Sequence, residues 1–164
     1  MTRKSDGIVV GYDGSPGAER ALRWAVREAW ERGTMLTVCL AWAPEYLAML
    51  GEASVYDLAR RKGEEILAKG AGYAGDALGP ETVRPVLARG PAARVLCERS
   101  GTAEMVVAGA RGHGGVAGLR LGSVAWQVAM HGHGPALSSA GGSRQRDRRT
   151  AARSSVVTRP VTRP

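Results

Sequence analysis

The chain has 164 residues, 44% of them hydrophobic, which suffices for one domain with a sizeable core and argues against wholesale disorder. No apolar run approaches the roughly 18 residues of a membrane span, and the polar residues 1–6 are no secretory signal, so we expect a cytoplasmic protein without a membrane partner. The net charge of +8 is uneven: residues 1–135 carry 16 Lys and Arg against 14 Asp and Glu, whereas residues 136–164 carry seven Arg and one Asp. Because the body is nearly neutral, nucleic acid is not an expected partner.

Hydrophobic patterning predicts alternating strands and helices. A β-branched run over 8–10 is followed by Ser15 and Pro16, which suit the cap and the first position of a helix, and Gly33 is placed to end that helix. The run over 35–42 is apolar almost throughout, which is typical of a strand buried on both faces of a parallel sheet. The further predicted elements are a helix over about 55–70, a strand over 82–88, a helix over 90–96, a strand over 105–108 and a helix over 123–130.

This order predicts an α/β protein: a single doubly wound parallel sheet with helices on both faces. Only its end departs from the pattern. Pro135 should introduce a fifth strand at the sheet edge, but the chain continues with polar, Gly- and Arg-rich sequence, so the fifth edge strand is doubtful. We therefore divide the chain into a nucleotide-binding α/β domain, 1–135, and a basic tail, 136–164, which we expect to be disordered. Residues 155–158 could pair as a strand, but about 20 residues of loop would have to intervene.

The cysteines and histidines show no pattern for metal binding. Cys39 and Cys97 lie in apolar runs, where a free cysteine behaves as a small core residue, with a disulfide or redox pair as the alternative. The three histidines have no cysteine or carboxylate neighbour at a metal-ligand spacing. We expect no metal site built from these residues.

The chemistry of the chain is concentrated in the glycine-rich stretch 109–123. Gly109 and Gly112 follow directly on the predicted fourth strand, and Gly122 and Ser123 open the next helix. Backbone N–H groups in a glycine turn and at a helix N-terminus bind phosphate oxygens, and the Ser123 hydroxyl can both cap its helix and donate to a phosphate. The stretch lacks the Gly-Lys-Ser/Thr of a Walker A loop, and its GxGxxA match has no following acid for a dinucleotide ribose.

The spacing G-x2-G-x9-G-S behind a Val-rich strand, with the opening Ile8-Val-Val-Gly-Tyr-Asp13-Gly-Ser-Pro, resembles the ATP-binding type of the universal stress protein family over about 7–135. The resemblance implies the strand order 3-2-1-4, in which Asp13 and Gly109 leave neighbouring strands and meet at the switch point where such sheets bind ligands. Family members normally end in a Val-rich edge strand that commonly pairs across a homodimer. This chain lacks that run, so the homodimer is doubtful.

The resemblance also implies nucleotide-binding residues. Asp13 would lie beside the ribose and phosphates, directly or through a metal ion, the backbone of Ala41 would meet the adenine, and Ala108 would line the base or ribose pocket. Arg111 would help to neutralise phosphate, with a solvated arginine as the alternative. The phosphate-contacting backbone of the family falls on Gly109, Gly112, Gly122, Ser123 and Val124.

The expected cofactor is therefore ATP, with Mg²⁺ as its companion, and the expected function is nucleotide-dependent regulation of a stress response through protein partners. No catalytic constellation is present in the sequence, so at most we expect slow ATP hydrolysis. Three alternatives stay open: an ATP-independent protein-interaction module of the same fold, an adenylate-transferring enzyme whose loop signatures residues 11–17 lack, and a tail that binds nucleic acid through phosphates.

Overall fold

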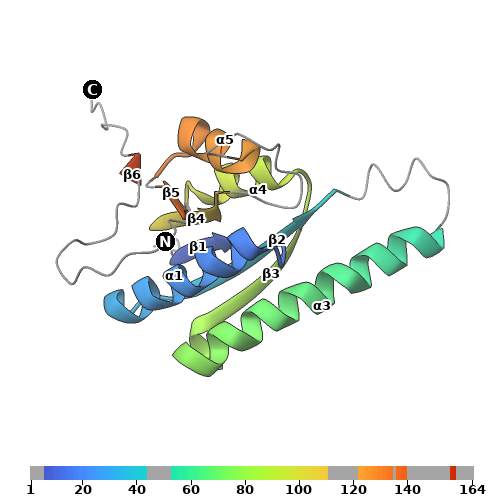
Figure 1. The fold of residues 1–164 in the computed structure, drawn as a ribbon, viewed down its shortest axis with the longest axis horizontal. Coiled ribbons are helices and arrows are strands. Elements are labelled where there is room, and N and C mark those ends of the chain that lie inside the picture. The colour runs from blue at the N-terminus through green and yellow to red at the C-terminus, as the bar shows by residue number, and fades with distance from the viewer. Residues whose placement is uncertain (1–5, 44–52, 111–121, 135, 140–155, 158–164) are drawn as a thin grey trace, which may run out of the picture.

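The computed structural model describes residues 6–43, 53–110, 122–134, 136–139 and 156–157, and its strands form one sheet in the order β3-β2-β1-β4-β5-β6 (Figure 1). The first four strands pair in parallel, which confirms the predicted order 3-2-1-4. The strands are β1 (Ile8–Gly11), β2 (Leu36–Trp42), β3 (Val83–Arg89), β4 (Met105–Gly109), β5 (Ala136–Ser139) and β6 (Val156–Val157).

The helices cover both faces of the sheet, as predicted: α1 (Pro16–Arg32) and α3 (Ala53–Leu78) lie on one face, and α4 (Ala92–Arg99) and α5 (Ser123–His131) on the other (Figure 1). A short 3-10 turn, η1 (Pro80–Thr82), leads into β3. Side chains alternate along β1, so that Ile8 and Val10 join the core under α1 and α3, whereas Val9 joins the core under α4 and α5. One short strand thus contributes to both hydrophobic cores.

Helix α1 begins and ends where its sequence predicts. The Ser15 hydroxyl accepts a hydrogen bond from the N–H of Ala18 at 3.2 Å, and Pro16 occupies the first turn, where its missing N–H costs nothing. Gly33 ends the helix in the left-handed region, at φ 61°, and its N–H bonds back to carbonyls of the last turn. Local chemistry alone is sufficient to define this helix.

Helix α3 continues to Leu78, so the predicted end near Gly70 is wrong. Gly70 does not end the helix because it faces the ring of Tyr12: a Cβ atom at this position would lie 2.5 Å from Cε1 of Tyr12. The helix exposes Leu58, at 70%, and buries Leu67 against the core under α1 and α3. Although α3 has 26 residues, neither it nor another helix in the described ranges is both long and apolar enough to cross a membrane.

The sheet does not stop at β4, so the expectation that a fifth strand is missing needs correction. Strand β5 pairs in parallel with β4, from Val106 opposite Ala136 to Gly109 opposite Ser139, and β6 pairs antiparallel with β5. Pairing is made by main-chain hydrogen bonds, which a polar sequence such as Ala-Leu-Ser-Ser supplies as well as a Val-rich one. A fifth strand is therefore present, although its outer edge is paired with β6, and the homodimer itself stays a prediction. The expected disorder of the tail concerns residues that lie mostly outside the described ranges.

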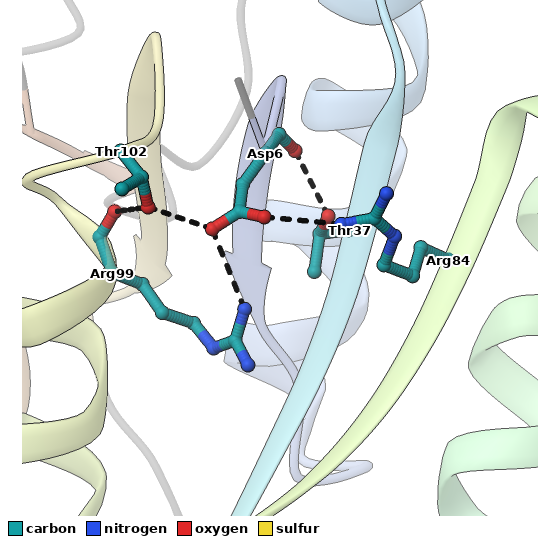
Figure 2. Close-up of polar contacts among 5 residues, drawn as sticks. All are labelled: Asp6, Thr37, Arg84, Arg99 and Thr102. Atoms are coloured by element: carbon teal, nitrogen blue, oxygen red, sulfur yellow. Dashed lines mark hydrogen bonds and ion pairs between the residues drawn. The ribbon is translucent and has the colours of Figure 1, made fainter. Parts of the chain in front are cut away.

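A cluster of polar groups closes the amino edge of the sheet around Asp6 (Figure 2). Its carboxylate accepts hydrogen bonds from Thr102 at 2.8 Å and from Arg84 on β3 at 3.1 Å, and it lies 3.5 Å from a guanidinium nitrogen of Arg99 on α4. Its main-chain carbonyl accepts from the buried Thr37 hydroxyl on β2 at 2.9 Å. The Asp6 side chain is only 16% exposed, and charge-assisted bonds in such a setting exceed those of surface pairs. Asp6 therefore ties β2, β3 and the end of α4 to the start of β1.

Tyr12 connects the end of β1 to both helices on its face. Its ring is 2% exposed and packs on Gly70 of α3, and its hydroxyl donates to Glu19 of α1 at 2.8 Å. Glu19 in turn lies 3.5 Å from Nζ of Lys69 on α3. Burial, assisted by the hydrogen bond and negative charge of Glu19, raises the pKa of Tyr12 to about 12. This residue fixes the chain immediately before Asp13.

The glycines of α3 provide a matched test of this packing. Gly72→Ala should stabilise the protein by about 0.5–1 kcal/mol, because it adds a better helix former and no atom lies within 4 Å of its new Cβ. Gly70→Ala should destabilise by about 1–3 kcal/mol, because the new methyl group displaces the Tyr12 ring. Urea unfolding followed by circular dichroism measures both. Equal stabilisation by the two substitutions would contradict the packing.

The raised pKa of Tyr12 predicts a loss of stability in alkali. The folded state holds this proton more tightly than the unfolded chain, whose tyrosine pKa is about 10, so the contribution is complete below pH 10 and is lost as the pH rises towards about 12. Between these limits the free energy of unfolding should fall by an amount of the order of 1–2 kcal/mol that Tyr12→Phe abolishes. The exposed Tyr73 supplies the control, since Tyr73→Phe should leave the dependence of the free energy of unfolding on pH as in the wild type. A slope unchanged by Tyr12→Phe would be the contrary result.

Candidate functional site

The loop between β1 and α1 holds Asp13 at the carboxyl edge of the sheet. Its Oδ1 accepts the N–H of Ser15 at 3.0 Å, and Gly14 between them has φ 77°, a conformation that suits glycine. Since Ser15 also caps α1, the carboxylate is fixed relative to the start of that helix. Asp13 is half-buried beyond the end of β1, beside the switch point between β1 and β4.

Gly109 brings the end of β4 against the start of α1. A Cβ atom on Gly109 would lie 2.7 Å from the carbonyl carbon of Gly17 and 2.9 Å from the nitrogen of Ala18, so no other residue fits without a shift of backbone. Strands β1 and β4 are also direct neighbours. Two predicted segments almost 100 residues apart, marked by Asp13 and Gly109, thus meet at the switch point of the sheet.

Helix α5 starts beside the end of β4. The N–H of Gly122 donates to the carbonyl of Ala110, which joins the two ends of the segment 111–121, and the N–H of Trp126 makes the first helical bond to Gly122. Gly122 is the N-cap and no side chain caps the helix; Ser123 is the exposed first helical residue. The prediction that the Ser123 hydroxyl caps α5 is wrong, because Ser123 stands one position too late. The start of α1 is capped by Ser15, whereas no side chain of the described residues caps the start of α5.

The remaining predicted residues divide into three groups. Val124 is half-buried and packs its side chain into the core under α4 and α5, so only its backbone reaches the edge. Ala41 lies near the carboxyl end of β2 and packs against the same core, while Ala108 is 6% exposed near the end of β4. These two residues lie on the strands that flank β1. Arg111 and Gly112 lie outside the described residues.

A groove of about 550 Å³ runs between α4 and α5, and sequence reasoning missed it. Its lining includes the predicted residues Ser123 and Val124 and, from α4, Arg94 and Cys97. The missed signal is electrostatic: α4 has no acidic residue in its first turn and carries Arg94 there, although the positive end of the helix dipole favours acids. Helix α4 therefore belongs to the surroundings of the site.

Both cysteines are free thiols, which agrees with the prediction of free cysteines rather than with the alternative of a disulfide. Burial raises the pKa of the Cys39 thiol and of the Cys97 thiol, so both remain protonated at neutral pH. The Cys97 thiol lies 3.7 Å from the carbonyl oxygen of Gln127 and so links α4 to α5. Within the described part of the chain, no three His, Cys, Asp or Glu side chains gather as metal ligands.

Solved structures with this fold are similar over nearly their whole length. The universal stress protein UspA from Lactobacillus plantarum superposes with a TM-score of 0.68 at 18% identity, over 84% of this chain and 99% of that one. A universal stress protein from Archaeoglobus fulgidus in complex with dAMP has a TM-score of 0.61 at 24% identity, over 82% and 98%. Another, in complex with cAMP, has a TM-score of 0.59 at 24% identity, over 84% and 98%. At these identities the likeness concerns the fold.

Sequence comparison gives closer relatives. A universal stress protein of Mycobacterium tuberculosis is 32% identical over 147 residues, and one of Mycolicibacterium smegmatis is 29% identical over 137. These alignments cover 79% and 80% of this chain but only 46% and 47% of the relatives, so the chain spans less than half of their length. The model of the universal stress protein family matches residues 5–137. The chain belongs to the universal stress protein family.

Proposed function

We propose that this protein binds ATP at the carboxyl edge of β1 and β4 and acts as a cytoplasmic, nucleotide-dependent regulator of a stress response. The observation that carries the proposal is the start of α5, which no side chain in the described ranges caps and which lies near the contact of Gly109 with α1. An uncapped helix start offers N–H donors and a positive dipole to an external anion, and a glycine contact lets a ligand approach the backbone. Phosphate is the group that fits both.

Different residues would contact the phosphates, the ribose and the adenine of the nucleotide. The N–H groups of Ser123 and Val124 would donate hydrogen bonds to phosphate oxygens, whereas the N–H of Gly122 already donates to the carbonyl of Ala110. Asp13, oriented by its bond from Ser15, would accept the ribose hydroxyls or hold Mg²⁺ beside the phosphates. Ala41 and Ala108 offer small side chains on either side of β1, which leaves room for an adenine over their backbone.

The complexes of two related proteins with dAMP and with cAMP support an adenine nucleotide as the ligand class. We infer ATP from the glycine spacing of the loop and Mg²⁺ from Asp13. Bound nucleotide would join the β1–α1 loop to the start of α5, and protein partners would respond to that joined arrangement. We infer at most slow turnover of ATP, with Asp13 and Ser123 as the side chains nearest the phosphates. The competing function is a protein-interaction module that acts independently of ATP.

A proline at position 123 tests the phosphate site without disturbing the helix. Proline suits the first helical position, and Gly122 already has the extended conformation, φ −72° and ψ 160°, that precedes a proline. Ser123→Pro removes the N–H assigned to phosphate, while Ser123→Ala removes only the hydroxyl. ATP with Mg²⁺ at 100 times its Kd should add about 2.7 kcal/mol, a rise in Tm of roughly 5–10 °C, to the wild type. Ser123→Ala should retain most of this rise and Ser123→Pro should lose most of it.

The melting temperatures without nucleotide serve as the folding control, and the three proteins should agree within a few degrees. Failure of ATP to raise the Tm of the wild type would reject the proposal in favour of the interaction module. An undiminished rise in Ser123→Pro would place the phosphates elsewhere.

A further inference from the structure

We propose that Arg94 on α4 binds the terminal phosphates of the nucleotide and so determines the preference for ATP over AMP. This inference rests on the proposed function and adds a residue from a helix that the glycine loop does not include. The groove between α4 and α5 is lined by Arg94 on one wall and by Ser123 on the other. A phosphate chain that starts at the N-terminus of α5 can therefore extend towards Arg94.

The guanidinium is directed towards the carboxyl edge of the sheet. A Cβ atom on Gly90 would lie 3.1 Å from Nη2 of Arg94, so the arginine side chain folds back over the turn that joins β3 to α4. Gly90 adopts φ 119°, a value that glycine tolerates, and its N–H bonds the carbonyl of Trp42 at the end of β2. The fixed turn places the guanidinium at the same edge as Asp13 and the start of α5.

The local electrostatic environment of Arg94 favours a further anionic partner. It stands in the first turn of α4, where the helix dipole disfavours a cation, and that turn contains no acidic residue. Its ion pair with Glu98, at 3.6 Å, joins side chains that are 66% and 68% exposed, and such pairs contribute little. A guanidinium has five donors, so one carboxylate does not saturate it, and its planar fork matches phosphate oxygens.

No other permanently charged side chain occurs in the described lining of the groove. The thiol of Cys97 is neutral at physiological pH because burial raises its pKa, and Gln127 is uncharged. A volume of about 550 Å³ falls within the range of small-ligand sites, which allows a phosphate chain with its bound water. Of the two basic side chains in the lining, His131 lies in the last turn of α5, whereas Arg94 faces the start of that helix, so Arg94 is the one placed to contact the terminal phosphates.

The experiment compares ATP, ADP and AMP titrated calorimetrically into the wild type, Arg94→Gln and Arg89→Gln. Arg89 is the matched control because it is an exposed arginine at the end of β3, at the same edge, and does not line the groove. Arg94→Gln should lower ATP affinity about tenfold and AMP affinity less than about twofold, since a bond to a charged group is lost only with the longer ligand. Arg89→Gln should leave the ratio of ATP to AMP affinity unchanged.

A wild type that binds nucleotide, together with an ATP to AMP ratio that Arg94→Gln leaves intact, overturns this inference while the proposed function stands. An equal loss of that ratio in Arg89→Gln also overturns it, because the effect is then general electrostatics. A wild type that binds none of the three nucleotides rejects both proposals. Melting temperatures without nucleotide verify that both variants fold, as expected for exposed side chains.

Discussion

The complete burial of β1 constrains everything else in this protein. Ile8, Val9 and Val10 have no exposed surface, and the strand pairs with β2 on one side and β4 on the other. A strand enclosed on both faces and both edges can meet water or a ligand only at its ends. The charged residues next to β1 accordingly lie beyond its two ends, Asp6 before its first residue and Asp13 after its last.

The two ends are held by different forces. At the amino end, the Asp6 carboxylate binds side chains from β3, α4 and the turn after α4, so charge closes this edge. At the carboxyl end, the absence of a side chain on Gly109 allows β4 and α1 to touch through their backbones, and no charged pair is required. Asp13 instead orients the β1–α1 loop through its bond from the N–H of Ser15. The arrangement keeps structural charge on one edge and leaves the other edge for ligand chemistry.

The predictions that succeeded depend on local chemistry or on the family resemblance. Ser15, Pro16 and Gly33 specify α1 by themselves, and the resemblance supplied the order 3-2-1-4. The failures depend on contacts between distant residues. The helix expected over about 55–70 continues to Leu78, and Gly70 within it admits the ring of Tyr12. Strand β5 could not be recognised from an apolar pattern, because main-chain groups make its pairing. Arg94 could be connected with the proposed site only from the structure, in which α4 lies beside α5. The nucleotide contacts of all the candidate site residues remain predictions, and Arg111 and Gly112 also lie outside the described residues.

The hydrogen bond between Ala110 and Gly122 has a consequence for how this family can change. It closes the segment 111–121 at its base, so the end of β4 and the start of α5 keep their separation whatever lies between them. Insertions and replacements in a segment closed in this way cost the scaffold little, because the added loop entropy grows only slowly with length. We therefore expect the sheet and helices to tolerate changes within 111–121, whereas the proposed phosphate contacts depend on the glycine spacing that this segment contains. Ligand preference can then diverge among related proteins, or be redesigned, while the sheet and its helices stay as they are.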